Sequence, residues 1–154
     1  MRDRWQPVGI LAGVLFAINA VVRLVVWQFG LKSDSKQIAV GFVGLGLVAL
    51  VMAGAGWRWG RRYPMSRVTP DLSVAVAVAC LLTVLVGPFL GGTRPFKEGA
   101  GLFFAEIWHY LAFAGGGAIL GLLVLMALGR DYRAEALKRY SRTRAAKPRR
   151  VVRR

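Results

Sequence analysis

Four long apolar stretches, separated by short polar segments, constrain the fold of this chain more than any other feature of its sequence. Each stretch is about as long as the ~20 residues that an α-helix needs to cross the hydrocarbon core of a bilayer. The intervening segments are too short to hold a separate globular domain, and a soluble fold with 56% hydrophobic residues would expose large apolar patches. The sequence therefore predicts an all-α bundle of four transmembrane helices over 1–129, followed by a basic tail over 130–154. The four stretches cover residues 8–27, 38–57, 72–90 and 103–128.

Lysine and arginine are distributed unevenly among the segments that flank the stretches. Half of the 22 basic residues follow residue 129, and most of the others lie before the first stretch or between the second and third. The two remaining segments hold only Lys32, Lys36, Arg94 and Lys97. Because cytoplasmic segments are enriched in lysine and arginine, the pattern predicts a multi-pass protein of the cell membrane with cytoplasmic N- and C-termini. The excess of arginine over lysine suits a GC-rich bacterial genome.

Local signals mark where individual helices begin or bend. The first stretch follows a basic start, as in a secretory signal peptide, but Arg23 interrupts it and no small-x-small cleavage site follows. It is therefore predicted to be retained as a span. Thr69-Pro70-Asp71 offers an N-cap, a proline for the first helical position and an acid for the positive end of the helix dipole. Gly87-Pro88 is expected to loosen or kink the end of the third helix.

A buried polar cluster is predicted from two pairs of residues within the spans. Asn19 and Arg23 are four residues apart, and Glu106 and His109 are three apart, so each pair lies on one helix face. At ~1.5 Å of rise per residue, Arg23 and Glu106 lie about 6 Å and 5 Å inside the same outer boundary. We therefore expect an Arg23–Glu106 ion pair, with Asn19 and His109 deeper. The cluster could pin two helices together, form a proton or ion pathway or a ligand pocket, or contact another subunit.

Catalytic, metal and cofactor sites are not predicted. Glu106-x-x-His109 is half of a di-iron motif, but His109 is the only histidine and no second such motif exists. The candidate nucleophiles Ser73, Cys80 and Thr83 have no histidine at their depth. Cys80 is expected to be a small buried apolar residue, and a single cysteine excludes an intramolecular disulfide.

Glycine spacing indicates how the helices pack, because helices in lipid associate through close backbone approach. Gly9-x-x-x-Gly13 lies in the first stretch and Gly117-x-x-x-Gly121 in the fourth, with further glycines in the second. These faces could join the four helices to one another or could dock a helix of a partner. The consecutive glycines 115–117 are expected to permit a bend or a very close helix contact.

The basic C-terminal region is predicted to extend the last span along the membrane surface over Arg130–Tyr140, and Ser141–Arg154 is predicted to be disordered. Anionic lipid is the expected partner of this region and of the loop between the second and third spans. Docking to an acidic protein is an alternative, whereas nucleic acid is disfavoured because no array of stacking aromatics accompanies the charges. The residues predicted to contact anionic lipid are Arg58, Arg61, Arg62, Arg130, Arg133, Lys138 and Arg139.

These observations favour a small polytopic membrane protein that serves as a non-catalytic structural, accessory or assembly subunit of a larger membrane complex. Its expected partners are other membrane subunits or further copies of itself. The alternative is a small oligomeric transporter or channel that uses the cluster of Asn19, Arg23, Glu106 and His109. A membrane enzyme is the least favoured class.

Overall fold

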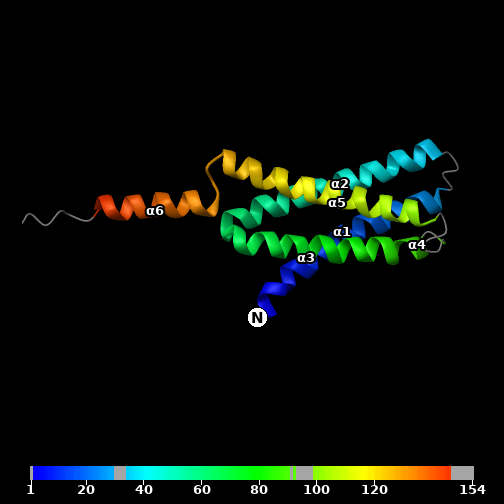
Figure 1. Ribbon diagram of the computed structural model, residues 1–154, viewed down its shortest axis with the longest axis horizontal. Coiled ribbons are helices and arrows are strands. Elements are labelled where there is room, and N and C mark those ends of the chain that lie inside the picture. The colour runs from blue at the N-terminus through cyan, green and yellow to red at the C-terminus, as the bar shows by residue number, and fades with distance from the viewer. Residues whose placement is uncertain (1, 30–33, 91, 93–98, 147–154) are drawn as a thin grey trace, which may run out of the picture.

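The structure is a computed structural model that describes residues 2–29, 34–90, 92 and 99–146, and these residues form helices and no strand (Figure 1). Helices α1, α2, α3 and α5 are the four that are long and apolar enough to cross a membrane, consistent with a multi-pass membrane protein. The all-helical class and the four candidate spans agree with the sequence prediction. The helices are α1 (Arg2–Gln28), α2 (Asp34–Arg62), α3 (Met65–Leu85), α4 (Gly87–Leu90), α5 (Ala100–Ala127) and α6 (Tyr132–Ala146).

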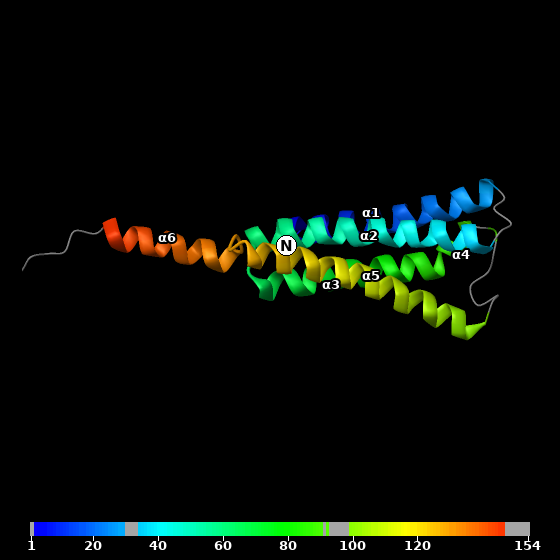
Figure 2. The ribbon, with the colours of Figure 1, turned by 90° about the horizontal axis from the view of Figure 1, so that it is seen from above.

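The four long helices form an up-and-down bundle around an apolar core. Helix α2 packs most extensively against α5, and α1 packs against α2 and α3. Helix α5 also packs against α3, but its backbone does not come close to that of α1, which lies diagonally across the bundle (Figures 1 and 2). The centre is filled by small and branched apolar side chains, with α3 the most buried of the four. Cys80 is among these buried residues, as predicted.

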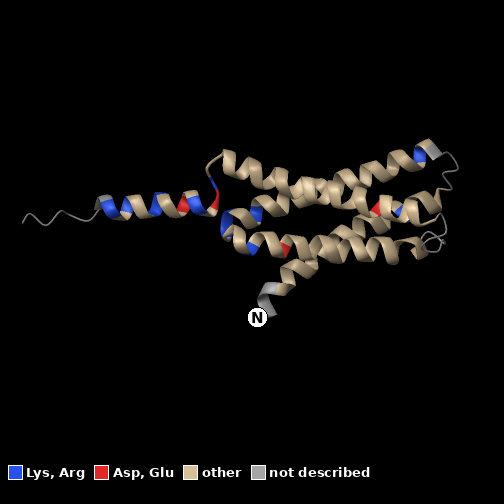
Figure 3. Cartoon of the chain, in the orientation of Figure 1, with Lys and Arg blue, Asp and Glu red and all other residues tan. Residues whose placement is uncertain are grey.

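Charge separates the two ends of the bundle. One end carries the turn between α2 and α3 and the start of α6, where arginines gather (Figure 3). We refer to it as the arginine-rich end. At the opposite end, where α1 and α4 finish and α2 and α5 begin, the described basic side chains are those of Arg23 and Lys36. Residues Lys32, Arg94 and Lys97 of the predicted outer loops lie outside the described residues.

Small residues allow the backbones of α2 and α5 to meet. A Cβ atom added to Gly117 or Gly121 of α5 would overlap the backbone carbonyls of Ala49 and Ala53 on α2. The glycine pair of α5 therefore packs inside the bundle. The sequence had left open whether such glycines join the four helices to one another or dock a helix of a partner. The consecutive glycines 115–117 lie within α5 without interrupting it.

The start of α3 differs from its prediction. The helix begins at Met65, after Pro64 in an extended conformation (φ −65°, ψ 151°), so Thr69 is not the N-cap and Pro70 lies inside the helix. Proline is tolerated there because it removes a single backbone hydrogen bond, to the carbonyl of exposed Ser66, where water can replace it. At the other end, α3 stops at Leu85 and resumes as α4 at Gly87, in line with the expected kink at Gly87-Pro88.

The C-terminal region also differs from its prediction. Gly129 ends α5 with a left-handed φ of 59°, and the amides of Gly129 and Arg130 donate to the carbonyls of Met126 and Leu125 in a Schellman motif. After this turn, α6 runs along the long axis of the bundle and away from it, rather than across its end (Figures 1 and 2). Residues 141–146, predicted to be disordered, are helical, because the good helix formers of α6 continue through them. Residues 147–154 of the predicted disordered tail lie outside the described residues.

Candidate functional site

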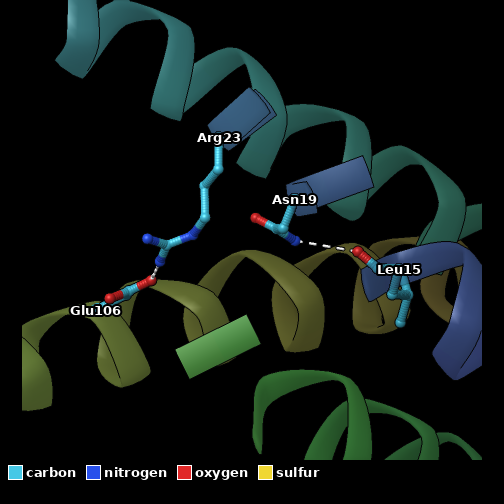
Figure 4. Close-up of polar contacts among 4 residues, drawn as sticks. All are labelled: Leu15, Asn19, Arg23 and Glu106. Carbon is cyan, nitrogen blue, oxygen red and sulfur yellow. Dashed lines mark hydrogen bonds and ion pairs between the residues drawn. The ribbon is translucent and has the colours of Figure 1, made fainter. Parts of the chain in front are cut away.

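An ion pair joins α1 to α5 across the bundle, near the end opposite the arginine-rich end. Nη2 of Arg23 donates to Oε1 of Glu106, and the two side chains are 26% and 38% exposed (Figure 4). Because α1 and α5 do not pack against each other, the long arginine side chain has to bridge the diagonal. The pair neutralises two charges that would each be unfavourable inside an apolar span.

The break between α3 and α4 makes room for this arginine. A Cβ atom at Gly87 would lie 2.7 Å from Nε of Arg23, closer than side-chain carbons approach such an atom. The absence of a side chain at Gly87 therefore lets the guanidinium pass α4 on its way to Glu106. Glycine at this position serves both the interruption of the helix and the passage of Arg23.

Asn19 and His109 lie beside the ion pair but are hydrogen-bonded within their own helices. Nδ2 of Asn19 donates to the Leu15 carbonyl at 3.1 Å (Figure 4). Nδ1 of His109 lies 2.7 Å from the Ala105 carbonyl, which can only accept, so this nitrogen carries the proton. The imidazole also meets the ring of Phe42 edge-on, at 6.4 Å between centroids. The structure therefore places the four residues together without linking Asn19 or His109 to the ion pair.

All four residues line one cavity of about 550 Å³, here termed the cluster cavity. It is bounded by α1, α2, α3 and α5 and combines polar groups with a larger apolar wall. The cavity is closed one helical turn deeper, where Leu15, Val48 and Ala114 are each 0% exposed. The other lining residues are Val22, Val26, Trp27, Gln37, Ile38, Gly41, Phe42, Leu45, Thr83 and Tyr110.

Two hydroxyl groups in this region were not predicted as part of the site. Oγ1 of Thr83 and the phenol oxygen of Tyr110 are buried, and the two hydroxyl groups lie close enough to interact with each other, although without the geometry of a full hydrogen bond. Tyr110 is one residue from His109, so it lies on a neighbouring face of α5, and Thr83 lies on a different helix. Their burial depends on how α3 packs against α5, and no spacing in the sequence indicates it.

A second cavity, of about 610 Å³, lies at the arginine-rich end between α2 and α6, and we term it the arginine cavity. It divides the residues that were predicted to contact anionic lipid. Arg58, Arg61, Arg62 and Arg139 line it, whereas Arg130, Arg133 and Lys138 do not. Nζ of Lys138 instead donates to the Gly129 carbonyl at 3.1 Å. The remaining lining residues, which the sequence did not single out, are Trp57, Tyr132, Glu135 and Ala136.

A further ion pair was missed at the start of α3. Nε of Arg67 lies 3.7 Å from Oδ2 of Asp71, and the guanidinium lies 4.1 Å from the centre of the Tyr63 ring. Asp71 is 6% exposed, so it is a buried acid rather than the first-turn acid that the sequence suggested. The spacing of four residues between opposite charges on a helix is the signal that could have identified this pair.

The glycines of α1 are left open. A Cβ atom at Gly9 or Gly13 would meet no atom within 4 Å, and both residues are exposed together with Ala17 on the same stripe. This face is therefore not used in packing the four helices. Other helical glycines are likewise open, but none of them is four residues from another open glycine; they are Gly41, Gly46, Gly54, Gly101, Gly115 and Gly116.

Within the described residues, no three histidine, cysteine or acidic side chains come together as a metal site would require. Comparisons with known protein families, with curated proteins and with solved structures found no match.

Proposed function

We propose that the protein is a non-catalytic accessory or assembly subunit of a larger membrane complex, held to its partner through helix contacts inside the bilayer. The observation that carries this proposal is the open glycine face of α1. Gly117 and Gly121 are used within the bundle, whereas Gly9 and Gly13, with the same spacing, face outward.

An exposed glycine pair is costly without a partner. Each glycine in a helix is about 1 kcal/mol less favourable than alanine, and facing lipid tails offers no compensating contact. A second helix that approaches closely enough to exclude lipid can offset this cost through van der Waals contact. The face therefore suits a transmembrane helix of another subunit, with a second copy of this chain as the alternative partner.

The polar cluster supports a structural role rather than transport. Arg23 and Glu106 neutralise each other, and Asn19 and His109 bond to their own helices. A conducting path would have to continue through the bundle, but apolar side chains fill the centre below the cluster cavity. The ion pair then acts as a clamp that holds α1 against the far side of the bundle.

A small oligomeric transporter is the second candidate, and the cluster cavity is the observation that favours it. The cavity is large enough for a small molecule, and its lining includes a carboxyl group and an imidazole, those of Glu106 and His109. Transport would require a second conformation in which the core beneath the cavity opens. Flux in proteoliposomes that is abolished by Glu106→Gln but retained by Glu135→Gln, which removes a charge outside the cavity, would promote this candidate.

The proposed location is the cell membrane, with both termini in the cytoplasm. The charge separation of Figure 3 supports this orientation, because the arginine-rich end would face the cytoplasm. Fusing a reporter that is active only outside the cytoplasm to the C-terminus tests it. We expect no activity from this fusion, and strong activity would reverse the orientation.

Purification in a mild detergent tests the accessory role directly. We expect the wild-type chain to elute with larger membrane proteins that mass spectrometry can identify. Gly13→Leu should release these partners because it fills the open face, whereas Gly54→Leu should retain them because it adds the same side chain elsewhere on the lipid-facing surface. Elution of the wild type as a single chain, or equal behaviour of the two variants, would contradict the proposal.

A further inference from the structure

The arginine cavity concentrates positive charge from two helices that are far apart in sequence. Arg58, Arg61 and Arg62 come from the end of α2, and Arg139 comes from the second turn of α6. The one acidic residue in the lining is Glu135, whose Oε2 lies 3.9 Å from Arg139. Like charges gathered around one space repel each other unless an anion lies between them.

The position of the cavity relative to the apolar span of α2 indicates the depth at which an anion would bind. Trp57 lies at the end of the apolar stretch, where indole rings prefer the depth of lipid headgroups. The three arginines of α2 follow directly, at spacings that keep them on neighbouring faces of the helix. The cavity therefore opens at the level where phosphate groups of a bilayer are found.

The chemistry of the lining selects for phosphate. A planar guanidinium matches two phosphate oxygens at once, and four of them give geometric selectivity that a diffuse basic surface lacks. With one carboxylate against four guanidiniums, a single negative charge would leave most of the excess uncompensated. Two or more negative charges match the cavity better.

We propose that the arginine cavity binds one phosphate-bearing polyanion with at least two negative charges, and that the bound anion fixes α6 against the end of α2. Lipid headgroups with two phosphates and soluble diphosphates share this chemistry. The site is distinct from general attraction to anionic lipid, because Arg133 and Lys138 of the same helix lie outside it. The proposal does not rest on the accessory role.

Native mass spectrometry of the full chain in detergent tests the site with three probes: cardiolipin, phosphatidylglycerol at matched total charge, and inorganic pyrophosphate. The cavity variant is Arg58→Gln/Arg139→Gln. The matched control, Arg133→Gln/Arg144→Gln, removes the same charge from α6 residues outside the cavity. Circular dichroism checks that both variants keep the helical content of the wild type.

We expect the wild type to retain one cardiolipin. The affinity of the cavity variant for cardiolipin should fall at least about tenfold, and that of the control should stay within about twofold of the wild type. Hydrogen exchange in Tyr132–Tyr140 should slow on binding in the wild type and the control. If cardiolipin binds and pyrophosphate does not compete, the source is a lipid headgroup; if pyrophosphate binds alone with the same dependence on the cavity arginines, the source is soluble. Equal weakening in both variants, equal retention of phosphatidylglycerol, or no bound anion would overturn the proposal.

Discussion

Replacing Gly121 by alanine tests whether the α2–α5 contact organises the bundle. The added Cβ would overlap the carbonyl oxygen of Ala53 and would lie 2.8 Å from its Cα and carbonyl carbon, where ordinary contacts are 3.4–4 Å. The carbons alone require the helices to separate by about 0.6 Å, the difference between 3.4 and 2.8 Å, and the closer carbonyl oxygen requires more, along the most extensive contact in the fold. Backbone atoms cannot rotate away as the end of a side chain can, so the whole helix must move.

The expected cost follows from this separation. A radial gap of about 0.5–1 Å forfeits roughly a quarter to a half of each van der Waals contact, and overpacking of a close-fitted interior costs about 1–3 kcal/mol. Alanine gains about 1 kcal/mol over glycine in helix propensity. The overpacking cost should lie in the upper part of its range, because the obstacle is backbone. After the gain in helix propensity is subtracted, the net loss of stability for Gly121→Ala is about 1–2 kcal/mol.

The matched control is Gly54→Ala, at a helical position where the new Cβ meets no atom within 4 Å. It should be neutral or more stable than the wild type by up to about 1 kcal/mol, because only the propensity gain applies. The two variants therefore differ in sign. Unfolding in mixed micelles with increasing dodecyl sulfate, followed by loss of helical circular dichroism, measures both.

A stability for Gly121→Ala equal to the wild type, or above that of Gly54→Ala, would refute the reasoning. It would mean that α2 and α5 are not in backbone contact at this position. Combining Gly117→Ala with Gly121→Ala should increase the loss, because Gly117 meets Ala49 in the same way.

Substitutions at three residues, Arg23, Glu106 and Tyr110, probe the cluster cavity with the same unfolding assay. Arg23→Gln or Glu106→Gln alone should each cost about 1–3 kcal/mol by leaving an unpaired charge near the membrane boundary, while the double variant should recover most of the loss. If the loss of stability in the double variant equals the sum of the two single losses, Arg23 and Glu106 do not form a structural pair. Tyr110→Phe should lower stability by less than about 1 kcal/mol, because the buried hydroxyl has only an incompletely formed interaction with Thr83 to lose, and a larger loss would reveal a full hydrogen bond.

The equal depth of Arg23 and Glu106 was accessible from the sequence because helical rise is constant and the spans alternate in direction. Depth alone does not specify which helices are neighbours. The structure places α1 and α5 on a diagonal, so the contact exists because arginine is long and because Gly87 leaves a passage. That passage depends on α4, a short helix that depth arithmetic does not include.

Errors in the prediction arose where local signals competed. Thr69-Pro70-Asp71 has the residues of a helix start, but the helix begins earlier at Met65, directly after the turn at Pro64. Gly129 was not recognised as a helix stop, so the direction of α6 was wrong. A left-handed residue at the end of α5 redirects the chain, and the direction that follows depends on backbone angles that sequence pattern does not specify.

The sequence by itself determined the four candidate spans and the segregation of arginines, because both depend on the solvation of each residue and not on its neighbours in space. Only the tertiary structure decided which glycines are consumed by packing and which remain open. Gly13 and Gly121 are each the second glycine of a pair spaced four residues apart, yet Gly13 faces outward and Gly121 meets Ala53. The difference arises from which helix faces meet in the bundle, and this arrangement depends on contacts between residues far apart in the chain.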